Sequence, residues 1–254
     1  MSGTLQIETA IQTPVARVRL LNPPLNVLEI AMMREMARAL GEIEARADVS
    51  VIVFEGDERA FSAGVDIKAH VPELVHEMLA SFHAVIRAIV ASRKVTIAVV
   101  RGACLGGGAE LAVVCDIVYT ARDATWGFPE IKLGCYPPVA AVALPALVGA
   151  KRASELILTG RTISGDEAVA IGLANRSALA SELDDVVQRT IDELRELSGV
   201  ALAHAKKALY GWDAIHFDKG LARAEEIYLE ELISTADARE GIAAFLGKRA
   251  AKWK

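Results

Sequence analysis

Short apolar runs alternate with stretches of helical spacing along the first half of the chain. The runs lie at Val15–Leu20, Val51–Glu55, Thr96–Val100 and Ile117–Thr120. Each has the length and apolar character of a buried strand. Between the first two, Ile30–Ala45 repeats apolar residues at helical spacing, and Asn26 upstream is a candidate N-cap. Strands joined by helices predict an α/β fold.

Beyond Pro137 the strand signals fade and helical patterns take over. Helices are expected at Ser181–Leu197, Val200–Tyr210 and His216–Ile233. Four glutamates in the last of them look like a solvated helix face. They are Glu225, Glu226, Glu230 and Glu231. No internal repeat is apparent, and the pattern predicts one large domain or a domain with an appended helical region.

Composition narrows the classes of partner. The 254 residues are 53% hydrophobic with a mean hydropathy of +0.32, which suggests apolar surface buried between subunits of a homo-oligomer. A formal charge of −5 argues against binding to nucleic acid or an anionic membrane. The start shows no secretory signal, and the longest apolar stretch, Pro137–Ala150, is too short to span a bilayer. We expect a cytoplasmic protein.

Cysteine and histidine offer no sign of a metal centre. The three cysteines, Cys104, Cys115 and Cys135, sit among apolar residues without a CxxC pair and are interpreted as reduced core thiols. The five histidines form no HxxxH or HExxH spacing. The sequence therefore predicts no metal.

A first segment with potential chemistry, Arg59–Lys68 (RAFSAGVDIK), follows the strand at Val51–Glu55. Its small residues Ser62, Ala63 and Gly64 allow a ligand to approach the backbone, whose N–H groups can face a developing negative charge. An ordinary strand-to-helix turn is an equally good reading of this segment alone.

A second segment, Arg101–Asp116 (RGACLGGGAELAVVCD), places three glycines at the start of a short helix. The N-terminus of a helix attracts anions. The run Gly106–Leu111 lacks the last glycine of GxGxxG, and no GK[ST] follows, so both nucleotide-binding motifs are weak. Glu110 lies in the first helical turn, where burial would raise its pKa and the helix dipole would lower it.

Glu130, in Thr125–Leu133 (TWGFPEIKL), is a possible partner for Glu110. It follows a proline and has apolar neighbours, which indicates a buried or half-buried acid, although a surface acid at a helix start is an alternative. Two carboxyl groups close together in apolar surroundings would split their pKa values and give one proton donor and one acceptor.

The order and spacing of three blocks resemble the enoyl-CoA hydratase/isomerase (crotonase) family. The blocks are FSAGVDIK, GACLGGGAELAVVCDIVYTARDATWGFPEIKLG and TADAREGIAAFLGKR. The resemblance spans nearly the whole chain and implies a spiral of ββα units, expected over residues 1–195. It also implies a C-terminal helical region, residues 196–254, that mediates assembly into a homotrimer or a homohexamer.

The resemblance also implies roles for particular residues. In the family, two backbone N–H groups form an oxyanion hole for the thioester oxygen, and they align with Val65 and Gly107. Glu110 and Glu130 align with the two catalytic glutamates of the hydratases, with Glu130 as proton donor and Glu110 as the base that orients water. The substrate-binding positions are Ala63, Val65, Asp66, Ile67, Lys68, Gly107, Pro138 and Lys248. Coenzyme A is then part of the substrate, and no separate cofactor is expected.

One departure concerns the residues after Glu130. Simple enoyl-CoA hydratases of the family have a glycine-rich stretch there, whereas this chain has Gly134–Ala141 (GCYPPVAA), and Pro138 has no N–H to hold a catalytic water. This variant resembles the cyclohexa-1,5-diene-1-carbonyl-CoA hydratases of aromatic compound degradation and favours a cyclic dienoyl substrate.

Other functions remain open from the sequence. A straight-chain enoyl-CoA hydratase, as in fatty acid metabolism, or an enoyl-CoA isomerase would use the same scaffold. A non-catalytic acyl-CoA-binding protein would need neither glutamate, so the presence of both argues against it. A nucleotide-binding oxidoreductase is disfavoured by the incomplete GxGxxG.

Overall fold

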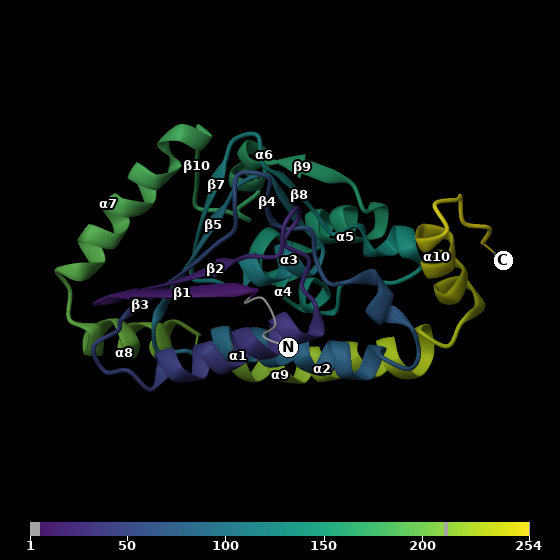
Figure 1. Cartoon of the computed structure of the whole chain (residues 1–254), viewed down its shortest axis with the longest axis horizontal. Coiled ribbons are helices and arrows are strands. Elements are labelled where there is room, and N and C mark those ends of the chain that lie inside the picture. The colour runs from purple at the N-terminus through teal and green to yellow at the C-terminus, as the bar shows by residue number, and fades with distance from the viewer. Residues whose placement is uncertain (1–5, 211–212, 254) are drawn as a thin grey trace.

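The computed structural model describes residues 6–210 and 213–253 and contains two β-sheets with helices packed around them (Figure 1). The larger sheet has the strand order β1-β2-β3-β5-β7-β10. Its strands are β1 (Ile7–Gln12), β2 (Val15–Leu20), β3 (Val51–Glu55), β5 (Val95–Val100), β7 (Ile117–Ala121) and β10 (Arg176–Ala178). β1 and β2 are antiparallel, and all other neighbours are parallel. Every residue of β3 and β5 is buried, as the apolar runs predict.

The smaller sheet has the order β4-β6-β8-β9 and strands of three residues each. They are β4 (Ala60–Ser62), β6 (Ala103–Leu105), β8 (Thr125–Gly127) and β9 (Thr162–Ser164). Strands this short carry too few residues for an alternating pattern, and the sequence did not predict them. β9 and β10 also lie beyond Pro137, where only helices were expected.

Three successive segments repeat one arrangement: a strand in the larger sheet, a strand in the smaller sheet, then a helix. They are β3-β4-α2, β5-β6-α3 and β7-β8-α4, with α2 at Val75–Ala91, α3 at Gly107–Val113 and α4 at Pro138–Val148. The predicted α/β spiral of ββα units is therefore confirmed. The repeat is structural, since no matching repeat is apparent in the sequence.

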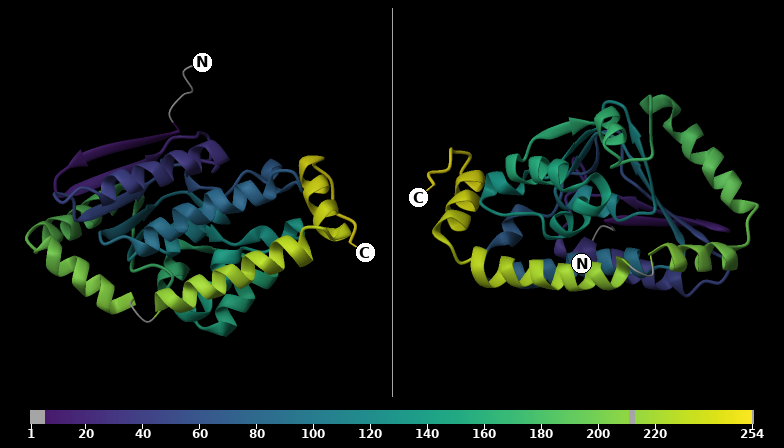
Figure 2. Two further views of the ribbon diagram at one scale, coloured as in Figure 1. Left: turned by 90° about the horizontal axis from the view of Figure 1, so that it is seen from below. Right: turned by 180° about the vertical axis from the view of Figure 1, so that it is seen from behind.

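Three long helices lie side by side along one face of the molecule (Figure 2). They are α1 (Ile30–Glu44), α2 and α9 (Asp213–Glu226). α1 buries Met32, Met33 and Met36 beneath the larger sheet, and α2 packs against it. The helix predicted at Ile30–Ala45 is confirmed to within one residue.

The other helices of the described residues are shorter than α1 and α2. They are α5 (Ala150–Thr159), α6 (Gly165–Ala170), α7 (Leu183–Arg195), α8 (Gly199–Tyr210), α10 (Ala236–Leu246), the 3-10 helices η1 (Ile67–His70), η2 (Pro129–Leu133) and η3 (Ala180–Glu182), and the π-helix η4 (Ile227–Leu232). The predicted C-terminal helices are confirmed, except that the last continues from α9 into η4. Residues 1–5 of the predicted core region and residues 211–212 and 254 of the helical region lie outside the described residues. The boundary at residue 195 stays a prediction.

The predicted solvated face of four glutamates is wrong at Glu225. Its carboxylate pairs with Arg87 of α2, at 3.0 Å and 3.1 Å, and with Nδ1 of the fully buried His83. The contact joins α9 to α2. The sequence could not reveal it, because the partners lie far apart along the chain.

The three cysteines are buried and free, so their interpretation as reduced core thiols is confirmed. Within residues 6–210 and 213–253, no helix is both long and apolar enough to span a membrane.

Candidate active site

The turn after β4 is fixed by the segment that precedes α1. The N–H of Leu28 donates to the carbonyl of Gly64 at 2.9 Å, and the N–H of Asp66 donates to the carbonyl of Leu28 at 3.1 Å. In an extended backbone successive N–H groups point to opposite sides. Because Gly64 and Asp66 face Leu28, the N–H of Val65 points away from it.

The N–H groups of Val65 and Gly107 are neighbours. A Cβ atom on Gly107 would lie 2.7 Å from Cγ2 of Val65 and 3.4 Å from its nitrogen, and a Cβ atom on Gly64 would lie 3.3 Å from the nitrogen of Gly107. Only glycine allows this approach. Neither N–H donates to a backbone carbonyl in the described part of the chain. Two adjacent, unpaired donors of this kind can hold an oxygen that gains negative charge.

Glu110 is enclosed between two helices. It lies in the first turn of α3 with 3% of its surface exposed, and its Oε1 accepts the N–H of Ala140 at 2.9 Å. Ala140 is in the first turn of α4, which begins at the buried Pro138. Burial raises the pKa of Glu110 to about 7, although hydrogen bonds from the N–H groups of Ala140 and Val139 oppose the rise. The sequence left this direction open.

Glu130 lies next to Glu110, with Gly106 between them. A Cβ atom on Gly106 would lie 2.6 Å from Oε1 of Glu130, and the carbonyl of Gly106 accepts the N–H of Glu110 at 2.9 Å. Oε2 of Glu130 is buried and has no hydrogen-bond partner in the described residues. Burial, and then the charge of Glu110, raises the pKa of Glu130 well above its usual value. Glu130 therefore holds its proton more tightly than Glu110 does.

The raised pKa of Glu110 predicts a pH-dependent stability. The folded state binds the proton more tightly than the unfolded state, so the stability present below pH 4.5 is lost as the pH rises through about 7. The loss from this group is about 3 kcal/mol. Glu110→Gln, whose amide oxygen can still accept from Ala140, should remove it. Urea unfolding of both proteins at pH 5 and pH 8 measures the difference, and an unchanged pH dependence in the variant would contradict the expectation.

The other predicted substrate-binding residues lie around η1 and the chain end. The carboxylate of Asp66 caps η1 by accepting the N–H of Lys68 at 3.1 Å. Ala63 and Ile67 are half-buried, whereas Lys68 is exposed. Lys248 is exposed immediately beyond α10, and α10 packs against η1. Their predicted contact with a ligand stays a prediction.

Two polar side chains, Ser62 and Asn26, hold the turn through hydrogen bonds that the sequence did not predict. The hydroxyl of Ser62 donates to the carbonyl of Asn26 at 2.7 Å and accepts the N–H of Gly64 at 3.1 Å. The Asn26 amide donates to the carbonyl of Ala60 at 2.9 Å. The expectation that Asn26 caps α1 is wrong, because its side chain binds β4 and Glu29 is the N-cap residue.

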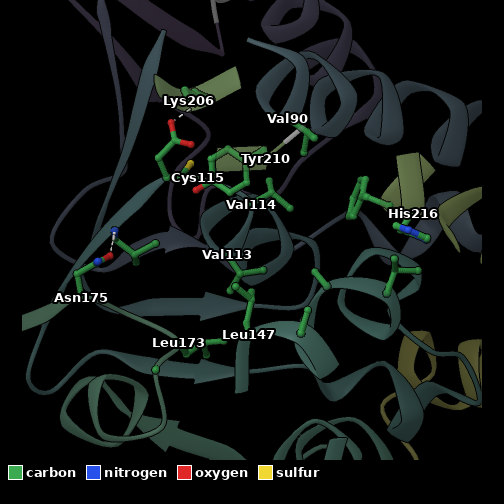
Figure 3. A pocket seen from close by; sticks show the side chains of 17 residues that line it. Val90, Val113, Val114, Cys115, Leu147, Leu173, Asn175, Lys206, Tyr210 and His216 are labelled. Carbon is green, nitrogen blue, oxygen red and sulfur yellow. Dashed lines mark hydrogen bonds and ion pairs between the residues drawn. The ribbon is translucent and has the colours of Figure 1, made fainter. Parts of the chain in front are cut away.

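A pocket of about 410 Å³ lies beyond the C-terminal end of α3, between α4, α8 and α9 (Figure 3). Glu110 and Glu130 do not line it. Its charged groups are already paired: Nζ of Lys206 lies 2.7 Å from the Asp116 carboxylate, which also accepts the N–H and hydroxyl of Thr96 at 2.7 Å and 2.8 Å. The glutamate pair, with its unpaired oxygen and raised pKa values, is the stronger candidate for chemistry.

Comparison with known proteins gives consistent matches along the chain. A family model described as enoyl-CoA hydratase/isomerase matches residues 10–254. The cyclohexa-1,5-dienecarbonyl-CoA hydratase of Thauera aromatica is 36% identical over 254 residues, covering 100% of this chain and 98% of that protein. A probable enoyl-CoA hydratase of Rhizobium meliloti is 37% identical, covering 99% and 98%. The crystal structure of an enoyl-CoA hydratase from Mycobacterium avium subsp. paratuberculosis matches with a TM-score of 0.89 and 27% identity, covering 98% of each chain.

Proposed function

This chain belongs to the enoyl-CoA hydratase/isomerase family, and we propose that it adds water to an α,β-unsaturated thioester of coenzyme A. The enzyme class predicted from the sequence, a lyase of the enoyl-CoA hydratase type, is confirmed at the level of the family. The observation that carries the proposal is the pair of neighbouring glutamates with raised pKa values beside two unpaired backbone N–H groups.

The N–H groups of Val65 and Gly107 form the oxyanion hole in this proposal. The thioester carbonyl accepts both hydrogen bonds, and the bonds strengthen as its oxygen gains enolate charge. Because the donors belong to the backbone of a glycine turn and a helix start, they are in place before the substrate binds.

The two glutamates divide the proton transfers. Glu110, with a pKa of about 7, is partly ionised near neutral pH and takes a proton from water as the water attacks the β-carbon. Glu130, whose pKa is higher, keeps its proton and delivers it to the carbon framework. Addition of water supplies both the hydroxyl and the proton, so this reaction needs no separate cofactor or metal.

The coenzyme A part of the substrate is proposed to lie along the turn and η1. The residues in contact are Ala63, Val65, Asp66, Ile67 and Lys68, with Lys248 directed at a phosphate. The exposed cations Lys68 and Lys248 can attract the phosphates of coenzyme A, although the chain as a whole is acidic.

For the acyl group we propose a cyclic dienoyl thioester. The buried Pro138 begins α4 beside Glu110. We call the start of α4 the wall of the proposed acyl site, and Pro138 makes it stiff and apolar. The name of the relative from Thauera aromatica supports this choice. A straight-chain enoyl thioester is the second candidate, favoured by the name of the relative from Rhizobium meliloti.

Incubation with a panel of coenzyme A thioesters in ¹⁸O-labelled water, followed by mass spectrometry, tests the reaction type. Hydration places ¹⁸O in the acyl chain of an intact thioester. Isomerisation leaves the mass unchanged, and hydrolysis places the label in a free acid. Absence of label in every thioester would overturn the proposed function.

We also predict a homo-oligomer, a trimer or a hexamer. Large apolar side chains are exposed on the C-terminal helices, among them Val200 at 70%, Leu209 at 69% and Phe245 at 53%. Packing against a second subunit would remove these side chains from water. Light scattering should give three or six times the 27.1 kDa of the chain. A monomer mass at all working concentrations would contradict the prediction.

A further inference from the structure

Tyr228 projects from an irregular turn in the C-terminal helical region. α9 runs into the π-helix η4, where the N–H of Ile233 donates to the carbonyl of Tyr228, five residues earlier, at 3.0 Å. One-turn π segments widen a helix locally and occur frequently at functional sites. Neither the sequence patterns nor the family resemblance pointed to this residue.

The hydroxyl of Tyr228 is buried without a hydrogen-bond partner. The residue is 1% exposed, and its oxygen has no partner in the described residues. Cys135 lies beside it, but a thiol is a weak partner, and its sulfur lies 3.7 Å from the carbonyl of Leu133. A buried hydroxyl left in this state is costly unless a ligand or water completes its hydrogen bonds.

A second unpaired oxygen lies nearby on Glu130. Its Oε2 is also buried and without a partner in the described residues. The N–H of Cys135 donates to the carbonyl of Glu130 at 3.1 Å, which places the Cys135–Tyr228 contact beside Glu130. Burial raises the pKa of both Cys135 and Tyr228, and a negative charge on Glu130 adds to the rise in each. The phenol can donate a hydrogen bond, and the carboxyl group can donate or accept one. Both groups can therefore form a hydrogen bond with a small polar ligand.

The segment carrying Tyr228 is firmly anchored. The hydroxyl of Tyr136 donates to the carbonyl of Ala224 at 2.5 Å, and the Tyr136 ring meets the Tyr228 ring edge-on, with centroids 5.4 Å apart. One turn before Tyr228, Glu225 is bound by Arg87 and His83 of α2. Tyr228 is therefore held in position before any ligand arrives.

We infer that the hydroxyl of Tyr228, together with Glu130, binds the oxygen that the reaction adds, first as water and then as the hydroxyl of the product. This inference rests on the proposed hydration. Pro138 has no N–H to donate to that oxygen, and in this inference the hydroxyl of Tyr228 supplies the missing hydrogen bond. Tyr228 transfers no proton in this role. Its hydrogen bond fixes the oxygen while the glutamates move the protons.

The variant Tyr228→Phe tests the inference because it keeps the ring and removes only the hydroxyl. Turnover should fall about tenfold or more, since a hydrogen bond to the reacting oxygen is lost. Affinity for 3-hydroxybutyryl-CoA should fall by a similar factor, whereas affinity for butyryl-CoA, which lacks the hydroxyl, should not change. The melting temperature should change little, because the hydroxyl has no hydrogen-bond partner in the described residues beyond the weak contact with Cys135.

Tyr119→Phe is the matched control. Tyr119 is also buried, but its hydroxyl is paired with Thr190 at 2.7 Å in the contact between β7 and α7. This variant should lose stability and keep both turnover and ligand preference. Unchanged turnover in Tyr228→Phe, or equal losses of affinity for the two thioesters, would overturn the role of Tyr228. Failure of the wild-type protein to incorporate ¹⁸O would overturn the hydratase proposal instead.

Discussion

Glu110→Gln and Glu130→Gln are each expected to lower turnover by roughly 10²-fold or more. Glutamine keeps the shape of glutamate but cannot transfer the proton. At position 110 its amide oxygen can still accept the N–H of Ala140, so the start of α4 should stay in place. Steady-state kinetics with the thioester that the wild-type protein hydrates fastest measures the loss in kcat. Affinity for a saturated acyl-CoA should change little, because the oxyanion hole and the coenzyme A contacts are intact.

Glu55→Gln provides a control for the removal of a buried acid. Glu55 is 7% exposed and is bound by Arg17 and Arg19, at 3.1 Å each, on the larger sheet. Its substitution should lower stability without lowering turnover. Near-normal turnover in both Glu110→Gln and Glu130→Gln would rule out the two-carboxylate mechanism.

The pKa directions support the assignment of acid and base that the sequence suggested. Two buried carboxyl groups side by side cannot both ionise easily. Glu110 accepts at least one backbone N–H hydrogen bond, which stabilises its ionised form, whereas Oε2 of Glu130 has no partner in the described residues. The shared negative charge is therefore favoured on Glu110, and the proton on Glu130.

The parts of the fold that the sequence predicted well are those whose hydrophobic pattern is long and continuous. β2 and β3 have the predicted bounds, and α1 ends one residue early. β1 was not predicted, because five of its six residues are exposed at the sheet edge and leave no apolar run. The helices α2 and α4 to α6 were not predicted either, although α2 buries a long apolar face.

The candidate site was predictable in its residues but not in its surroundings. Gly107 and Glu110 could be placed at a helix start from their spacing, and the structure brings Gly107 next to Val65. The hydrogen bond from Ala140 to Glu110 joins two residues that are 30 positions apart in the chain and lie on different helices. The unpaired hydroxyl of Tyr228 likewise depends on tertiary packing. Local patterns contain no information about such contacts.

The acyl specificity is the second strong expectation, and it depends on the start of α4. Pro138 occupies the first position of this helix, where its fixed φ suits the geometry, and both Pro138 and Val139 are buried. The same turn donates the N–H of Ala140 to Glu110, so the start of α4 and the catalytic base are held together. A flat ring loses less conformational entropy in a stiff, apolar slot than a flexible chain does.

Cyclohexa-1,5-diene-1-carbonyl-CoA should therefore be hydrated at least roughly tenfold faster than crotonyl-CoA, measured as kcat/KM. Pro138→Gly should reduce this ratio, because glycine restores a backbone N–H and loosens the wall. Pro145→Ala is the control in the same helix: Pro145 is exposed in the interior of α4, so its removal should leave the ratio unchanged. Equal kcat/KM values for the two thioesters in the wild-type protein would refute the cyclic substrate while leaving hydration itself intact. A ratio that Pro138→Gly does not alter would show that specificity resides elsewhere in the site.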